Sequence, residues 1–226
     1  MITLFHGDDI TASRAALDRM IEREKNKEIR RLEGKNIDTT LLVQSLESSS
    51  LFGGETLAVI DGLFGQITKK QKRIEELTRI LLEAGCDVFL WEDRLLPPGI
   101  VSKLGKASVQ QFKLPAIIFS LLDGLRPKCA SACLPLLERV LDMQPAEVVY
   151  AMLFRRIREL IQLQDRVTPE RMAPWMAMRL TAQSRSFTMN ELIAMHGALV
   201  EMDTRIKSGS SPFSMAQLLE QFLIAL

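Results

Sequence analysis

The chain has 226 residues, of which 47% are hydrophobic and 25% are charged, and its formal net charge is +1. This composition is typical of a globular protein and excludes a disordered chain. Basic and acidic residues are balanced in both halves, which argues against a basic arm that binds nucleic acid strongly by itself. No apolar run is as long as a membrane span, and Met1-Ile2-Thr3 is not the basic start of a signal peptide. We therefore expect a cytoplasmic protein without a membrane partner.

The first part of the sequence alternates short apolar runs with helical patterns. Strands are predicted at 1–6, 56–61 and 86–91, with weaker candidates at 28–33 and 108–112. Helices are predicted from about Thr11 to Lys27, after the N-cap Asp38, and after Thr68, where Ile74, Leu77 and Leu81 recur at helical spacing. Strands that alternate with helices indicate a parallel α/β sheet with helices on both faces.

After Pro115 the strand signal ends, and helical patterns follow. Helices are predicted at 127–143 and 145–163, each with a proline where a first turn begins, and then at 192–206 and 218–226. The second part is therefore predicted to be all-helical. We place the two domains at 1–113 and 114–226.

The end of the first predicted strand is where a nucleotide-binding chain carries its phosphate loop. Such a loop needs inward-facing backbone N–H groups, a lysine for the phosphates and a Ser or Thr for Mg²⁺. Here Gly7 is followed by Asp8 and Asp9, and no Gly-Lys-Ser/Thr sequence occurs anywhere. The two aspartates are suited to the N-terminus of a helix, where they serve as a cap.

The remaining candidates for catalytic or metal-binding residues form no recognisable set. Asp61 and the pair Glu92-Asp93 follow predicted strands, but without a phosphate loop they are interpreted as solvated acids. His6 and His196 belong to no triad or metal pattern, and for His6 a hydrogen-bonded structural role is favoured. Cys129 and Cys133 are interpreted as small buried hydrophobic residues. We therefore expect no enzyme activity, no metal and no cofactor.

The stretch SSSLFGGETLAVID, residues 48–61, carries two adjacent large apolar residues in a loop. Leu51 and Phe52, flanked by Ser50 and Gly53, precede a predicted strand. On residue type alone, a buried plug under the sheet is somewhat favoured over an exposed wedge. As a wedge in a partner's pocket, each side chain would contribute about 1.5–3 kcal/mol. Both interpretations stay open at this point.

Three early segments and two later ones together resemble a known family. LFHGDDITASRAAL, SLFGGETLAVIDGL and CDVFLWEDRLL resemble the first domain of the bacterial DNA polymerase III delta subunit. The segment from IIFSLLDGL to IQLQDR resembles the start of the family's collar domain, and LVEMDTRIKSG resembles its C-terminal signature. The resemblance covers nearly the whole chain in order.

The resemblance implies a degenerate AAA+ or RecA-like sheet without a phosphate loop, followed by a collar-like helical domain. Delta subunits act as the wrench of the clamp loader, and a Leu-Phe pair enters a hydrophobic pocket on the sliding clamp. That pair corresponds to Leu51 and Phe52 here, so the resemblance favours the wedge. The implied partners are the sliding clamp, the ATPase subunits and a delta-prime-like subunit, with DNA reached indirectly through the complex.

Two further features are judged against the family pattern. The C-terminal signature is matched by Asp203, Ile206, Lys207 and Gly209, which are predicted to support the collar. The arginines at 155, 156 and 158 are interpreted as a solvated face. Typical delta subunits carry a helical lid domain between the sheet and the collar. Here the last predicted strand leads almost directly to the collar, so the chain resembles a shortened form without a lid.

Two other functions are weighed beside this one. A stand-alone adaptor would use the same loop to bind the clamp or another protein, without assembly into a loader. An enzyme acting on an unrecognised nucleotide is disfavoured by Asp8 and Asp9. Any DNA polymerase activity credited to such a chain would belong to the assembled holoenzyme, since no polymerase site is recognised in it.

Overall fold

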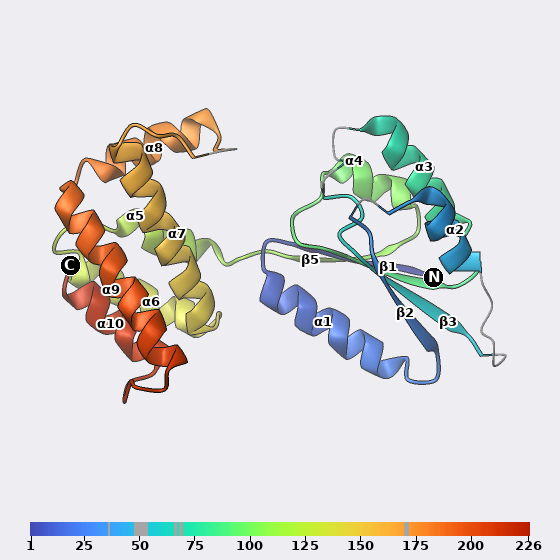
Figure 1. Cartoon of the computed structure of the whole chain (residues 1–226), viewed down its shortest axis with the longest axis horizontal. Coiled ribbons are helices and arrows are strands. Elements are labelled where there is room, and N and C mark those ends of the chain that lie inside the picture. Colours follow the sequence, from blue (N-terminus) through green and yellow to red (C-terminus); the bar gives the residue numbers. More distant parts are fainter. Residues whose placement is uncertain (36, 48–53, 66, 68–69, 170–171) are drawn as a thin grey trace. The chain divides into compact units, whose positions relative to one another are not determined.

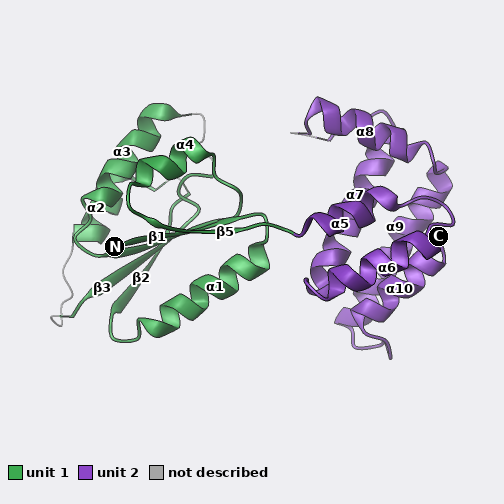
Figure 2. Ribbon diagram, turned by 180° about the vertical axis from the view of Figure 1, so that it is seen from behind, with its two compact units in different colours: residues 1–114 green, residues 115–226 purple. Residues whose placement is uncertain are grey.

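The computed structural model of the chain describes residues 1–35, 37–47, 54–65, 67, 70–169 and 172–226 (Figure 1). The chain divides into two compact units, Met1–Leu114 and Pro115–Leu226 (Figure 2). This division falls one residue after the boundary suggested by the sequence. Each unit is described by itself.

The first unit is an α/β domain built on a five-stranded parallel sheet. Its elements are β1 (Ile2–Gly7), α1 (Ile10–Arg23), β2 (Glu28–Glu33), α2 (Thr39–Glu47), β3 (Thr56–Asp61), α3 (Gln71–Leu82), β4 (Asp87–Glu92), α4 (Pro98–Val101), the 3-10 turn η1 (Ser102–Leu104) and β5 (Ser108–Phe112). The strand order is β2-β3-β4-β1-β5, and every pair is parallel. The predicted parallel sheet is confirmed.

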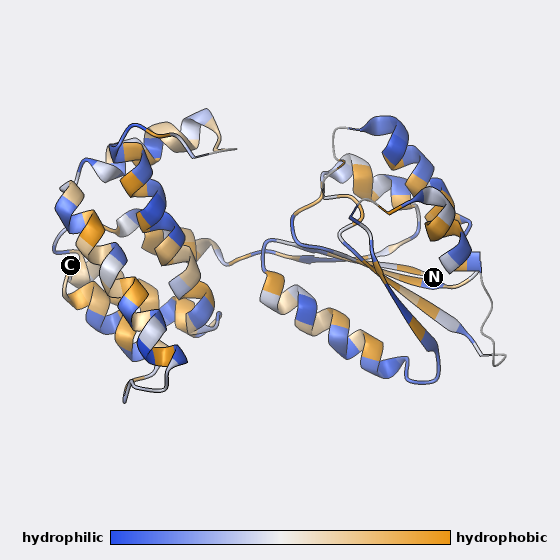
Figure 3. Cartoon of the chain, in the orientation of Figure 1, coloured by the Kyte–Doolittle hydropathy of each residue, from blue (hydrophilic) through white to orange (hydrophobic). Residues whose placement is uncertain are grey.

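Helices cover both faces of this sheet (Figure 1). On one face α1 packs through Ala16, Leu17 and Ile21 against side chains such as Phe5 and Phe89. On the other face lie α2, α3 and α4, which pack on the alternate strand residues, Leu4, Ala58, Ile60, Val88 and Leu90. Alternate residues of each central strand are therefore buried on opposite faces, which explains why those strands are continuous apolar runs (Figure 3).

The second unit is all-helical, so the predicted fold class, an α/β domain followed by an all-α domain, is confirmed. Its helices are α5 (Ala116–Gly124), α6 (Ala130–Leu141), α7 (Ala146–Gln164), α8 (Pro174–Ser184), α9 (Met189–Lys207) and α10 (Met215–Ile224). Apolar stripes predicted on α6, α7 and α9 are buried, for example Leu137, Leu153 and Leu199. Cys129 and Cys133 are buried as predicted.

Two helices of this unit were not predicted. α5 is short and apolar around most of its circumference, and α8 buries only Leu180 and Ser184 within the described residues. Neither sequence has the alternation of apolar and polar residues that identifies an amphipathic helix. Among the described residues, no helix combines the length and the apolar character needed to cross a membrane.

Candidate functional site

The turn between β1 and α1 consists of Asp8 and Asp9 alone, because β1 ends at Gly7 and α1 begins at Ile10. Asp9 is the N-cap of α1, and its Oδ1 accepts a hydrogen bond from the backbone N–H of Ala12 at 2.9 Å. Asp8 Oδ1 accepts one from the N–H of Leu114 at 2.9 Å. The helix N-terminus, which would favour a phosphate in a nucleotide-binding fold, is thus capped by the chain's own carboxylate.

Gly7 allows β5 to approach this turn closely. Its φ is +148°, and a Cβ atom at this position would lie 1.7 Å from the carbonyl oxygen of Phe112. The backbone N–H of Gly7 donates to the carbonyl of Arg94 at 3.2 Å, and that of Asp9 donates to the carbonyl of Phe112 at 3.3 Å. These N–H groups are therefore used within the protein, and the described turn has no cradle for a phosphate.

Glu92, at the end of β4, is not the solvated acid that the sequence suggested. Its side chain is fully buried, and its two oxygens accept hydrogen bonds from the N–H groups of Phe64 at 2.6 Å and Gly65 at 2.9 Å. Burial raises the pKa of Glu92 to about 7, although these hydrogen bonds act in the opposite direction. A carboxylate therefore satisfies the backbone donors of the loop after β3, and the prediction of a solvated acid was wrong here.

Asp61, at the end of β3, is about one-third exposed and is also engaged with the protein. Its Oδ2 lies 2.6 Å from Nη2 of Arg14 on α1. The guanidinium of Arg14 lies over the ring of Trp91, 3.6 Å from its centroid, and Trp91 Nε1 donates to Ser13 Oγ at 3.1 Å. This cation–π contact and ion pair fix the N-terminal half of α1 against the ends of β3 and β4.

His6 has the structural role that the sequence favoured. It is buried, and its Nδ1 accepts a hydrogen bond from the N–H of Leu96 at 3.1 Å. Burial lowers the pKa of His6, and the nearby Lys113 lowers it further. In the part of the chain that the structure describes, no three His, Cys, Asp or Glu side chains are grouped to hold a metal ion.

The candidate binding residues Ser50, Leu51, Phe52 and Gly53 lie outside the described residues. The elements that flank them are described: α2 ends at Glu47, and β3 begins at Thr56. Because the sheet is parallel, all its strands begin at one edge, which we call the N-terminal edge, and end at the other, the C-terminal edge. The chain enters β3 from Gly54 at the N-terminal edge, whereas a nucleotide would bind at the C-terminal edge.

Described residues on both sides of the segment 48–53, Ser45 and Glu55, are bonded to residues 27–30. The N–H of Glu28 donates to the carbonyl of Glu55 at 2.9 Å, and Arg30 Nη1 donates to the carbonyl of Ser45 at 3.3 Å. Lys27 Nζ lies 3.3 Å from Glu55 and 2.5 Å from Asp87, the first residue of β4. Its hydrogen bonds, to Asp87 first and then to Glu24, raise the pKa of Lys27.

The four residues that match the C-terminal signature lie at the end of α9 and just beyond it. Lys207 Nζ is 2.7 Å from Asp203 Oδ2, one turn earlier. Gly209 has a φ of +66°, and its N–H donates to the carbonyl of Ile206 at 3.1 Å, as in a helix that ends with a left-handed glycine. These contacts are local to one helix end, and the supporting role in a collar remains a prediction.

The arginine run on α7 faces two directions. Arg155 is exposed and pairs with Glu159, and Arg158 is also exposed, as predicted. Arg156 was wrongly predicted to lie on a solvated face: its side chain is only 11% exposed and Nη1 donates to Asp123 and to Gln183, each at 2.9 Å.

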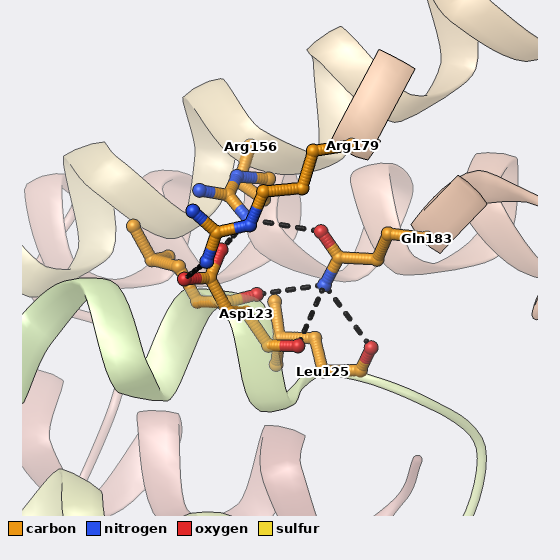
Figure 4. A network of polar contacts seen from close by, with 6 residues as sticks. Asp123, Leu125, Arg156, Arg179 and Gln183 are labelled. Carbon is orange, nitrogen blue, oxygen red and sulfur yellow. Dashed lines mark hydrogen bonds and ion pairs between the residues drawn. The ribbon is translucent and has the colours of Figure 1, made fainter. Parts of the chain in front are cut away.

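Around Arg156 lies a polar network that sequence reasoning missed (Figure 4). Arg179 of α8 also bonds to Asp123 of α5. Gln183 Nε2 donates to the carbonyls of Leu122 at 2.8 Å and Leu125 at 3.2 Å, near the C-terminal end of α5. The network ties together α5, α7 and α8. Its members are far apart in sequence, so no local pattern identified them.

The chain was also compared with known proteins. No protein-family model and no curated protein matches it. Among solved structures it is similar to the DNA clamp loader delta protein of Bacillus subtilis, with 12% sequence identity and a TM-score of 0.45 over 99% of this chain and 94% of the other.

Proposed function

We propose that this chain is a non-catalytic, delta-like subunit of a clamp loader. In this proposal the α/β unit binds the sliding clamp through Leu51 and Phe52 and helps to open it during DNA replication. The helical unit assembles with the ATPase subunits and a delta-prime-like subunit. Those partners hydrolyse ATP, and DNA is reached only through the assembled complex.

The observation that carries this proposal is the state of the C-terminal edge of the sheet. The backbone N–H groups of Gly7 and Asp9 donate to the chain's own carbonyls, and Asp9 caps α1. A protein that has the sheet of a nucleotide-binding domain but no phosphate cradle fits a subunit that works beside ATPases. The family-like segments, which occur in order along nearly the whole sequence, support the choice of a delta-like role.

The proposed subunit would be a shortened form without a lid domain. Only Lys113, Leu114 and Pro115 separate the end of β5 from the start of α5. Neither the proposed clamp contact nor the helical unit includes a lid, so both parts of the proposed role are available to the shorter chain.

The test is direct binding of this chain to the sliding clamp of the same organism, measured by isothermal titration calorimetry. We expect Leu51→Ala/Phe52→Ala to weaken binding by about 100-fold or more, since two apolar contacts of about 1.5–3 kcal/mol each are lost. The matched control is Leu41→Ala, which removes an exposed leucine from α2 (52% exposed) and should leave the affinity unchanged.

Two results would contradict the proposal. One is a wild-type chain that does not bind the clamp. The other is a double variant that unfolds, as judged by circular dichroism, because Leu51 and Phe52 would then be the buried plug. A stand-alone adaptor would bind the clamp equally well, but it would not co-purify with the ATPase subunits, whereas the proposed loader subunit would.

A further inference from the structure

The sheet of the first unit has two outermost strands, β2 on one side and β5 on the other. Among the described residues, β2 pairs with β3 alone and β5 pairs with β1 alone. Each outermost strand therefore has an outer side, away from its neighbour, toward which half of its backbone N–H and C=O groups are directed. An extended segment of another chain can add to a sheet by pairing with such groups.

The two outermost strands differ in their protection against such pairing. β2 has the sequence EIRRLE, with charges at Glu28, Arg30, Arg31 and Glu33. β5 has the sequence SVQQF and carries no charge. Charged side chains on an outermost strand protect it, because an added strand would have to desolvate them. β2 has this protection and β5 lacks it, so β5 is the side that favours a further strand.

The hydrogen bonds of β5 show which of its backbone groups face outward. The carbonyl of Phe112 accepts a hydrogen bond from the N–H of Asp9, just after β1, so Phe112 directs its backbone groups toward β1. Successive residues of a strand direct these groups to opposite sides. Val109 and Gln111 therefore direct their N–H and C=O groups to the outer side, where two donors and two acceptors can pair with a further strand.

The side chains of β5 suit a further strand as well. Val109 keeps 42% of its surface exposed, and Phe112 is half-buried against the core that contains α1. Side chains alternate between the two faces of a strand, so Val109 and Phe112 lie on opposite faces. Apolar residues of an added strand would contact Val109 on one face and Phe112 on the other.

The end of β5 that lies near the start of β1 has a positive charge to spare. Lys106, two residues before β5, is exposed and forms no ion pair within the described part of the chain. The other two cations at this end are already paired, Lys103 with Glu75 at 2.9 Å and the ammonium of Met1 with Asp87 at 2.5 Å. An acidic residue of a partner would find Lys106 available.

The opposite end of β5 is followed directly by Lys113, which is exposed and likewise has no ion pair among the described residues. Asp8 lies at this end too, where its Oδ1 accepts a hydrogen bond from the N–H of Leu114, and it offsets part of the positive charge. The two ends together thus favour a partner segment that is acidic at its ends, most strongly beside Lys106.

The same lysines disfavour a second copy of this chain as the occupant. In an antiparallel pair of β5 strands centred on Gln110, Lys106 of one copy would lie opposite the partner's Leu114, beside the partner's Lys113. Each end of such a pair would bring two lysines together, which is destabilising.

We propose that the outer side of β5 receives an extended segment of another protein, uncharged along the length of β5 and acidic at both ends, which joins the sheet as a further strand. The backbone groups of Val109 and Gln111 supply the hydrogen bonds, and the lysines at the two ends select the charge. This inference goes beyond the proposed function and does not rest on it, because none of its residues belongs to the proposed clamp contact.

The first experiment uses a capped seven-residue peptide of alternating valine and threonine with a glutamate at each end. Its binding to the full chain is followed by backbone hydrogen exchange in nuclear magnetic resonance spectra. At a peptide concentration of about ten times the dissociation constant, exchange of the Val109 and Gln111 amides should slow about 10-fold. Exchange of the Arg31 amide on β2 should not change.

The second experiment removes one outward donor. Gln111→Pro deletes an N–H on the outer side and leaves the hydrogen bonds to β1 in place, and we expect it to weaken peptide binding at least about 5-fold. The matched control is Arg31→Pro. Since the N–H of Glu28 donates to the carbonyl of Glu55, Arg31, three residues later, faces away from β3, and its substitution should leave the affinity unchanged. Circular dichroism checks that both variants fold.

The third experiment needs no variant of the chain. A peptide with lysine in place of each terminal glutamate should bind the wild-type chain at least about 5-fold more weakly, and the difference should shrink at high salt. Equal affinities of the two peptides would overturn the acidic character of the partner.

Other outcomes would overturn the site itself. Unchanged exchange at Val109 and Gln111 with the glutamate peptide at about 1 mM would show that no strand is added there. Equal losses in Gln111→Pro and Arg31→Pro would place the peptide elsewhere. Self-association of the wild-type chain in sedimentation equilibrium, abolished by Gln111→Pro, would make a second copy the occupant. A chain that binds the peptide but not the clamp would overturn the proposed function and leave this inference standing.

Discussion

The two edges of the central sheet differ: one is closed by internal hydrogen bonds, and the other is open at a cavity. At the C-terminal edge, the backbone N–H groups of Gly7, Asp9, Phe64 and Gly65 all donate to oxygens of the same chain. At the N-terminal edge, a cavity of about 490 Å³ opens between α2, β3 and β4, and exposed carboxylates stand at its mouth.

This difference concerns where backbone donors remain available to a ligand. A phosphate cradle needs unpaired backbone donors, and internal carboxylates and carbonyls remove them without changing the order of strands and helices. The C-terminal edge then contributes to stability, and in the proposed function the partner binds at the opposite edge. The contrast makes specific predictions about which substitutions harm folding and which do not.

The largest effect is expected at Gly7. In Gly7→Ala the new Cβ would lie 1.7 Å from the Phe112 carbonyl oxygen at a φ of +148°, so β5 or the turn must move. We expect a loss of at least about 3 kcal/mol in the free energy of unfolding, measured with urea.

The matched control for Gly7→Ala lies at the other edge. Gly85 has nothing within 4 Å of the place where a Cβ would stand. Gly85→Ala should therefore change the free energy of unfolding by less than about 1 kcal/mol. Equal effects of the two substitutions would contradict the contrast between a closely packed and an open edge.

The next effect concerns the pH dependence caused by Glu92. Its pKa is about 7 in the folded protein against an ordinary value of 4.5. Between these values the unfolded chain releases the proton first, so the free energy of unfolding falls as pH rises from 4.5 to 7. The contribution of Glu92 is fully present below pH 4.5 and is lost above pH 7, a change of about 3 kcal/mol.

Glu92→Gln should abolish this part of the pH dependence. The difference in unfolding free energy between wild type and variant should therefore fall by about 3 kcal/mol over that pH range, as measured by urea unfolding at each pH. The control is Asp93→Asn, whose carboxyl is half-exposed and has its pKa lowered, mainly by a hydrogen bond from Arg94. A flat difference for Glu92→Gln would mean that the hydrogen bonds from Phe64 and Gly65 outweigh burial.

A smaller effect is expected at the N-terminal edge from Lys27. Its side chain is 17% exposed, and its ammonium lies within 3.3 Å of Glu24, Glu55 and Asp87. Lys27→Met leaves Glu24 and Glu55 without their shared cation, whereas Asp87 keeps the N-terminal ammonium of Met1 at 2.5 Å, so we expect a loss of about 1–2 kcal/mol in chemical unfolding. Lys25→Met, which removes an exposed lysine two residues earlier, should have little effect. Equal losses in the two variants would show that the cluster does not stabilise this edge.

The sequence allowed the sheet to be predicted because its central strands are buried on both faces and form unbroken apolar runs. The sequence identified β2 only weakly. Glu28–Glu33 is the outermost strand on one side of the sheet, has charges at four of six positions and is defined by its pairing with β3. It missed α8 because few residues of that helix face the core. The helical spacing of apolar residues can be recognised in a sequence only when one face of the helix is buried.

The interior polar contacts were the hardest to predict. Glu92 was interpreted as solvated because the donors that hold it, Phe64 and Gly65, lie 28 and 27 residues earlier. Arg156 was assigned to a solvated face, although its partner Asp123 lies 33 residues away. Leu51 and Phe52 remain a prediction from the family resemblance, since they lie outside the described residues.

The smallest effect is expected from Asp61, and it tests whether every acid of the C-terminal edge matters for folding. Its pair with Arg14 is about one-third exposed on each side, so solvent screens the attraction. Asp61→Asn should therefore cost less than about 1 kcal/mol, because Arg14 keeps its contact with the Trp91 ring. Arg14→Met removes both contacts and should cost more in the same urea unfolding experiment. If Asp61→Asn proved as damaging as Gly7→Ala, the stability of this edge would depend on its ion pair, and the close approach of β5 would not be its main determinant.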